Sequence, residues 1–242
     1  MRSNLLICAV CLLALASGCK RRGQQYANNS AGSGGVSNNL PRDPGRARAL
    51  LEQGKQLYRD DKDEEAVAMF QEALKSDPEL AEARFRLGLG YEALGKREDA
   101  EAEYKKAVES YKKYLAEHDD DPEAYYDLGQ TYAGLAQYSE AIRQYRKATE
   151  LKDNDADIYY DLGVAHTRLA QYDAAAAAFS KSLEIDPDNY RAQDGLDDAK
   201  EGIKRIRAGR KHQEDLLKKQ KEDEEKKAAA GGSPAPGPTK KP

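Results

Sequence analysis

Small, apolar and aromatic residues recur between residues 47 and 189 in a pattern that itself repeats. Four glycines set the frame: Gly54, Gly88, Gly129 and Gly163. Twelve residues after each glycine comes an alanine, and sixteen after it comes an aromatic residue. Successive glycines are 34 residues apart, except for the second and third, which are 41 apart. A long period of this kind predicts a stack of similar units, each a pair of amphipathic helices.

Each predicted unit has a simple physical basis. Glycine and alanine let the two helices approach closely, and the aromatic residue fills the gap against the next unit. Asp-Pro pairs at residues 77–78, 121–122 and 186–187 end or start helices, because proline cannot continue a helix and restricts the residue before it. No unit buries its apolar face alone, so stability comes from stacking neighbours.

This pattern resembles the tetratricopeptide repeat (TPR) family, whose signature is W-x-x-L-G-x-x-Y, then A-x-x-x-F, then P. Leucine precedes the glycine in three of the four units. The resemblance implies an all-α fold, a right-handed α-solenoid of about four helix pairs with a C-terminal capping helix. It places the repeat region at residues 46–189, with units at residues 47–80, 81–121, 122–155 and 156–189.

The second unit carries seven extra residues. The triplet Tyr-Lys-Lys occurs at residues 104–106 and again at residues 111–113. Seven residues make nearly two turns at about 3.6 residues per turn, so we expect the second helix of this unit to extend by two turns with the same side buried. The protruding end is either a partner contact or a harmless elongation.

Residues 190–230 predict a capping and charged helix. Leu196, Ala199, Ile203 and Ile206 form one apolar stripe suited to covering the last repeat. Beyond the stripe most residues are charged or alanine, which predicts a solvated helix. The last segment, residues 231–242, is rich in glycine and proline and predicts a disordered tail.

The first eighteen residues have the features of a bacterial signal peptide. A basic residue is followed by an apolar run at residues 5–15, shorter than the ~20 residues that span a bilayer. The small residues before Cys19 resemble the lipobox of bacterial lipoproteins. The resemblance implies cleavage after Gly18 and attachment of acyl chains such as palmitate to Cys19. Ordinary secretory cleavage is the alternative.

The residues after Cys19 are relevant to where the protein lies in the cell envelope. In the sorting rule known for lipoproteins of Gram-negative bacteria, aspartate after the cysteine retains the protein in the inner membrane. Lys20 stands there, so the resemblance implies a lipid anchor in the outer membrane, on the periplasmic side. Residues 19–45, rich in Gly, Ser and Asn, predict a disordered tether. The basic residues 20–22 either attract anionic lipid or keep the tether soluble.

Charge and composition narrow the function classes. The chain has 39 Lys and Arg against 43 Asp and Glu, unlike nucleic-acid binders, which usually show a strong basic excess. Within residues 46–200 the counts are 22 and 35, so the repeat region is acidic while both ends are basic. An acidic body favours basic partners through electrostatic steering, although simple solubility is the alternative.

Little in the sequence points to catalysis. Cys8 and Cys11 lie in the signal peptide and leave with it, and lipid would cap Cys19. The three histidines fall in different predicted elements, and His166 takes a position that tyrosine holds in sister repeats, which predicts a packed core residue. There is no nucleophile motif or phosphate-binding loop. We expect no enzyme, no cofactor, no metal site and no small-molecule substrate.

The TPR resemblance also implies a binding surface. In TPR folds the first helix of each unit lines a concave groove, and residues just ahead of the Leu-Gly pair point into it. Carried over to this chain, with Leu51 and Phe85 at the same positions in the first two units, the rule gives a set of partner-binding residues. They are Arg86, Tyr126, Asp127, Gln130, Tyr160 and Asp161. The two Tyr-Asp pairs are either a ladder for basic or amide-donating ligands or common repeat consensus.

The expected partner is a protein or peptide segment of a cell-envelope complex. TPR domains that clamp a C-terminal carboxylate use Lys and Asn in the groove, whereas Asp127 and Asp161 would repel one. A lipobox followed by a short TPR stack resembles the pilotins of type IV pilus secretins. The alternatives are an adaptor for peptidoglycan enzymes or a factor for outer-membrane protein assembly.

Overall fold

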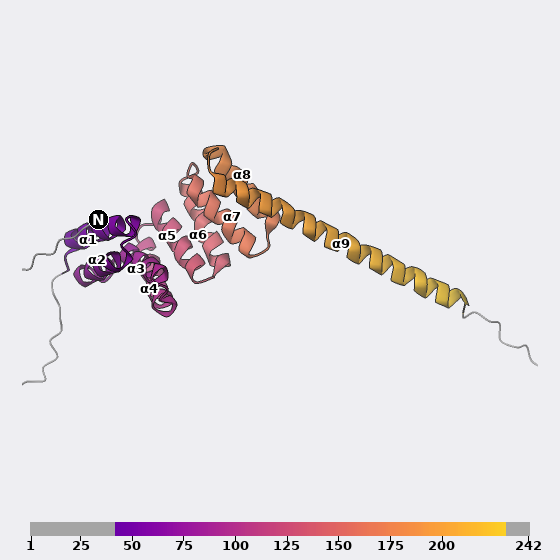
Figure 1. Ribbon diagram of the computed structural model, residues 1–242, viewed down its shortest axis with the longest axis horizontal. Helices are drawn as coiled ribbons and strands as arrows, with labels where there is room; N and C mark the ends of the chain where they lie inside the picture. Colours follow the sequence, from indigo (N-terminus) through magenta and orange to yellow (C-terminus); the bar gives the residue numbers. More distant parts are fainter. Residues whose placement is uncertain (1–41, 231–242) are drawn as a thin grey trace, which may run out of the picture. The chain divides into compact units, whose positions relative to one another are not determined.

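The computed structural model describes residues 42–230, and every regular element in this range is an α-helix (Figure 1). In chain order the helices are α1 (Pro44–Arg59), α2 (Asp63–Ser76), α3 (Ala81–Ala93), α4 (Arg97–Leu115), α5 (Pro122–Gly134), α6 (Tyr138–Leu151), α7 (Ala156–Arg168), α8 (Tyr172–Ile185) and α9 (Tyr190–Ala230). The signal peptide, Cys19, residues 20–41 of the tether and the C-terminal tail lie outside the described residues. The predicted tether ends too late: Asp43 caps α1, which begins at Pro44, so the last residues of the tether are helical.

The helices pack as four pairs, α1 with α2, α3 with α4, α5 with α6 and α7 with α8. Each pair packs on the next, and α9 packs on α8 and α7. The chain therefore forms an all-α solenoid with a C-terminal helix, as the sequence predicts. Because each helix contacts mainly its neighbours in sequence, stability is distributed along the stack.

The glycine and aromatic positions meet as expected. A Cβ atom built on the glycine of each unit would lie 2.5–2.7 Å from a ring atom of the aromatic residue sixteen positions later. Two rings are also covered from the far side: Tyr104 lies against Gly134 and Phe179 against Gly195, both in the next helix pair or in α9. Two of the four aromatic rings, those of Tyr104 and Phe179, are thus each packed against two glycines, which allows the following helix pair or α9 to approach closely.

The turn inside each helix pair uses a left-handed residue that the sequence pattern does not reveal. Asp61, Gly95, Ala136 and Ala170 have φ between 55° and 71°, and each lies seven residues after the glycine of its unit. In only one of the four turns is this residue a glycine. The other three carry the steric cost of a side chain in this region, about 1–2 kcal/mol per residue.

The extension of the second unit is shorter than two turns. Helix α4 has 19 residues, whereas α2, α6 and α8 have 14 each. Five of the seven extra residues therefore lengthen the helix, and the remaining two lie in the loop to α5. The buried stripe continues into the extension through Tyr111 and Leu115, so the side that faces the stack is unchanged.

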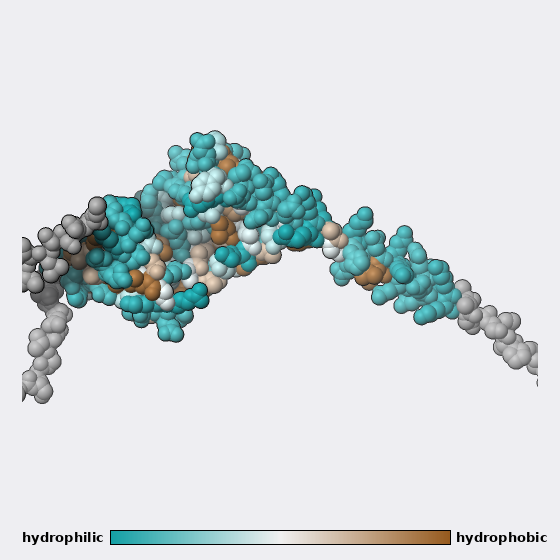
Figure 2. Space-filling view, viewed as in Figure 1, coloured by the Kyte–Doolittle hydropathy of each residue, from teal (hydrophilic) through white to brown (hydrophobic). Residues whose placement is uncertain are grey.

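Helix α9 has two different halves. Ala192 and Ala199 are fully buried, and Gly202 lies under the ring of Tyr172. The predicted apolar stripe ends early, because Ile206 is 43% exposed. From there to residue 227 every side chain is exposed, and the outer half is mostly hydrophilic (Figure 2). Within residues 42–230 no helix is both long enough and apolar enough to cross a bilayer.

Candidate partner-binding groove

The first helices of the four pairs, α1, α3, α5 and α7, lie side by side, each in contact with the next. We call the surface that they share the first-helix face. It has a hollow at either end. One, of about 370 Å³, is enclosed by α1, α3, the end of α4 and α5. The other, of about 560 Å³, lies between α7, α8 and α9.

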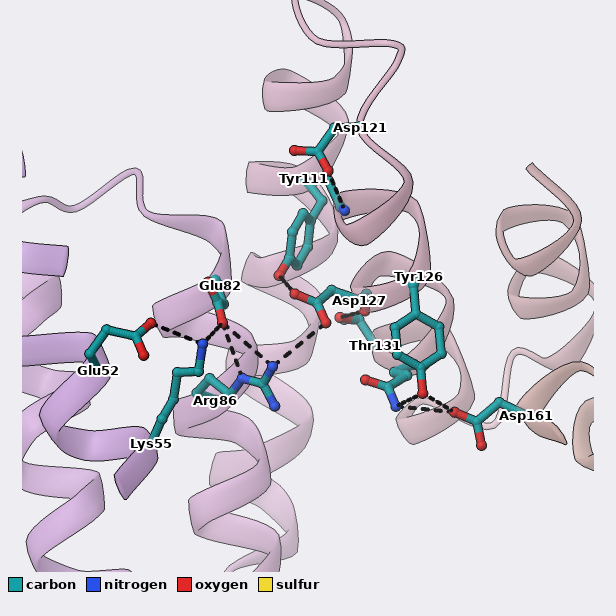
Figure 3. A network of polar contacts seen from close by, with 12 residues as sticks. Glu52, Lys55, Glu82, Arg86, Tyr111, Asp121, Tyr126, Asp127, Thr131 and Asp161 are labelled. Carbon is teal, nitrogen blue, oxygen red and sulfur yellow. Dashed lines mark hydrogen bonds and ion pairs between the residues drawn. The ribbon is translucent and has the colours of Figure 1, made fainter. Parts of the chain in front are cut away.

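A chain of alternating charges crosses the first three helices of this face (Figure 3). Lys55 Nζ lies 2.9 Å from Glu52 Oε1 and 3.0 Å from Glu82 Oε1. Arg86 continues the chain, at 3.4 Å from Glu82 Oε1 and 3.8 Å from Asp127 Oδ1. Each cation is shared by two carboxylates that come from neighbouring helices, so the network ties α1, α3 and α5 together.

Asp127 ends this chain in a nearly buried position, with 13% of its side chain exposed. The Tyr111 hydroxyl, from the extended part of α4, donates a hydrogen bond of 2.8 Å to Oδ2. Burial raises the pKa of Asp127 to about 6, although Arg86 and the Tyr111 hydroxyl act in the opposite direction. The carboxylate is therefore held ionised at neutral pH against a desolvation cost.

Asp161 sits at the same position of the next repeat but in a different environment. The Tyr126 hydroxyl donates to Asp161 Oδ2 at 2.8 Å. Gln130 Nε2 donates to the same oxygen at 3.1 Å and to the Tyr126 hydroxyl at 2.9 Å. Burial again raises the pKa of the carboxyl, and these two donors oppose the shift. The three side chains form a closed polar cluster across α5 and α7.

Tyr160 faces the second hollow, away from both carboxylate clusters. Its ring lies 5.8 Å from that of Phe179, and the Arg191 guanidinium of α9 stands over it at 4.6 Å from the centroid. This spacing suits a cation–π contact. Tyr160 therefore joins α7 to both α8 and α9.

The structure groups the six sequence-predicted residues into three places along one face. Arg86 and Asp127 lie together, Tyr126 lies with Gln130 and Asp161, and Tyr160 lies apart. That these residues contact a partner stays a prediction. One neighbouring expectation is wrong: Phe85 is 1% exposed and belongs to the core, because its ring packs toward Tyr104, 6.3 Å away. His166 is buried as predicted, 3% exposed.

Sequence reasoning missed several residues that shape this face. Glu82 links Lys55 to Arg86, and Arg191 reaches Tyr160 from a helix outside the repeats. Tyr111 and Tyr114 border the first hollow. The repeated Tyr-Lys-Lys triplet contains a usable signal for Tyr111. A helix that keeps its phase places the two triplet tyrosines, Tyr104 and Tyr111, on the same buried side.

Comparison with known proteins identifies the repeats. Three family models described as "Tetratricopeptide repeat" match residues 48–79, 79–154 and 126–190, together more than half of the chain. No curated protein sequence matches.

Among solved structures, a crystal structure of MamA is 30% identical and covers 73% of this chain and 96% of its own, with a TM-score of 0.47. A second MamA structure is 28% identical over 79% and 98% of the two chains, with a TM-score of 0.48. YrrB, described as "a TPR protein with an unusual peptide-binding site", is 21% identical over 61% and 90%, with a TM-score of 0.33. On the family matches and the four helix pairs, the chain belongs to the tetratricopeptide repeat family.

Proposed function

We propose that this protein is a non-enzymatic scaffold that binds a protein segment along its first-helix face and is held at the outer membrane by lipid on Cys19. One observation carries the binding role: half-buried polar side chains from α1, α3, α5 and α7 form a nearly continuous surface between two hollows. Such a surface offers both hydrogen-bonding groups and apolar area to an extended or helical segment.

The membrane anchor rests on the sequence around Cys19 alone. We propose that three acyl chains hold the protein at the periplasmic side of the outer membrane, because each buried methylene adds ~0.8 kcal/mol to membrane affinity. In cells fed radiolabelled palmitate, label should enter the wild-type chain and not the Cys19→Ala variant. Cys11→Ala is the matched control and should label normally. Unlabelled wild-type protein would contradict the anchor.

The binding role is tested by capture of cross-linked envelope proteins on the full chain. Replacing Tyr160 by Ala together with Asp161 by Asn alters the first-helix face and should lower the recovery of bound proteins at least fivefold. The control replaces Glu101 and Lys105 by Ala, an exposed ion pair on α4, and should leave recovery unchanged. Equal recovery from both variants would exclude binding through this face.

Assistance to type IV pilus secretin assembly is the role we propose first, from the layout of a lipobox followed by a short TPR stack. In a host that has a secretin, deletion of the gene should abolish heat-resistant secretin multimers in outer-membrane extracts. The wild-type gene should restore them and Cys19→Ala should not. Multimers that persist would leave the second candidate, an adaptor for peptidoglycan enzymes or outer-membrane protein assembly.

A further inference from the structure

The hollow at the N-terminal end of the first-helix face has one wall that the extension of α4 supplies. Tyr111 and Tyr114 form one wall, and both come from the added residues. The extension is fixed at three points. The Tyr111 hydroxyl bonds Asp127, the Tyr114 hydroxyl donates to Asp121 Oδ2 at 2.9 Å, and Lys113 pairs with Glu79. The wall is therefore anchored to the α2–α3 loop, to the α4–α5 loop and to α5.

The lining combines an apolar floor with an acidic rim. Leu51, Leu80, Ala81 and Ala124 supply apolar surface. Five carboxylates and a single cation, Arg48, complete the lining; the carboxylates are Glu52, Glu82, Asp121, Glu123 and Asp127. Lys55, Arg86 and Lys152 pair with four of these acids, all except Asp121, but none of the three cations is among the lining residues. The hollow thus presents more negative than positive charge to whatever enters it.

Asp127 supplies the most specific acceptor in the hollow. Its Oδ2 accepts the Tyr111 hydroxyl, whereas its Oδ1 has only Arg86 Nη2, at 3.8 Å. That separation exceeds hydrogen-bond distance. No described residue donates a hydrogen bond to Oδ1. One oxygen of a nearly buried carboxylate therefore retains its acceptor capacity next to a cavity lined by tyrosine and leucine.

We propose that this hollow binds an arginine or lysine side chain of the partner protein, an inference that rests on the proposed binding role of the first-helix face. A volume of about 370 Å³ is at the small end of ligand sites and suits one long side chain. Its methylenes would lie against Leu51 and Leu80 while its charged end meets Asp127 Oδ1 and the acidic rim. Arginine fits better than lysine, because its planar group bridges two acceptors and stacks on tyrosine.

The test begins with selection of random twelve-residue peptides on the purified full chain. Selected peptides should be enriched in arginine and lysine. The tightest one is then remade with citrulline, a neutral analogue of the same shape, in place of arginine. We expect the replacement to weaken binding at least tenfold in the wild type and less than threefold in Asp127→Asn. Glu101→Gln, which neutralises an exposed carboxylate on α4 outside the hollow, is the matched control and should keep the full tenfold effect.

The possible outcomes separate the binding role of the first-helix face from the cation site in the hollow. If no peptide is selected, the proposed binding role itself fails. If the selected peptides lack basic residues, or citrulline costs the same in the wild type and in Asp127→Asn, the binding role stands and the cation site is overturned. If replacing residues 20–22 by glutamine raises peptide affinity tenfold, the chain's own basic segment occupies the hollow and the partner assignment falls. If Asp127→Asn folds poorly, Glu82→Gln replaces it in the citrulline experiment, with the same expected result.

Discussion

Asp127 and Asp161 occupy the same position of successive repeats, 34 residues apart, yet they belong to two different kinds of site. Asp161 receives two hydrogen bonds on one oxygen from Tyr126 and Gln130, both on the neighbouring helix α5. Asp127 receives one, from Tyr111 on the extended α4, and its side chain lines a hollow. The repeat motif places the carboxylate, and the neighbouring unit decides what that carboxylate can do.

The difference separates a carboxylate that joins two repeats outside the hollow from a carboxylate that lines the hollow. Asp161 joins two repeats through a closed cluster, so its hydrogen bonds contribute to the stack. Asp127 is kept ionised in a nearly buried place where burial raises its pKa to about 6. A group held at a cost to stability is typical of functional sites. Four measurements test whether the two aspartates differ in this way.

The largest effect on stability is expected from Tyr111, whose hydroxyl donates to Asp127. Tyr111→Ala should lower the free energy of unfolding by about 3–5 kcal/mol, because it empties a buried aromatic site. Tyr126→Ala should cost less, since its ring is only partly buried. Urea unfolding of both variants checks this. Equal losses would mean that the two clusters hold the stack together equally.

Removing the charge of each aspartate should separate the two sites. Asp127→Asn should raise the free energy of unfolding at pH 7 by about 1–3 kcal/mol, because the neutral amide avoids the desolvation cost and can still accept from Tyr111. Asp161→Asn should change stability by less, since two hydrogen bonds to Oδ2 already stabilise its charged form. A loss of stability in Asp127→Asn would contradict the energetic cost assigned to this carboxylate.

The raised pKa of Asp127 predicts the direction in which the free energy of unfolding changes with pH. The folded pKa of Asp127, about 6, lies above the unfolded value, so between them the folded state binds more protons. The stability contributed by this group is therefore greatest at low pH and is lost as pH rises through 6. Between pH 5 and pH 7 the wild type should lose about 1 kcal/mol relative to Asp127→Asn. A difference that stays constant would exclude the raised pKa.

The smallest effect on stability should be equal in the two repeats that carry Asp127 and Asp161. Ala136 and Ala170 follow α5 and α7, the helices that carry the two aspartates, and both have φ of 55°. Replacing either by glycine should stabilise the protein by about 0.5–1 kcal/mol, because glycine adopts this conformation without steric cost. The gains should match to within error in thermal unfolding, and Gly95→Ala should show the reverse sign.

Local patterns predict this fold well and its hollow poorly. The glycine and aromatic spacings predict the helix pairs, because each contact lies within one unit or between neighbours. Phe85 is mistaken for a groove residue because it holds the same repeat position as Tyr126 and Tyr160. All three rings pack toward the aromatic residue of the second helix, but Phe85 has no hydroxyl to reach the groove and is 1% exposed. The hollow requires α1, α3, α4 and α5 to meet, and no single repeat contains that information. The left-handed turn residues are missed because only one of the four is glycine.

The seven residues added to the second unit also remove the equivalence of the four units. A stack of identical units could be reordered without changing its surface, because every junction would be the same. Here the second unit carries a wall that its neighbours lack, so exchanging it with another unit would move the hollow along the array. Exchanging the third and fourth units would leave the hollow's wall in place. One duplication that keeps the phase of the helix thus gives a repeating scaffold a defined direction and a hollow at one defined position.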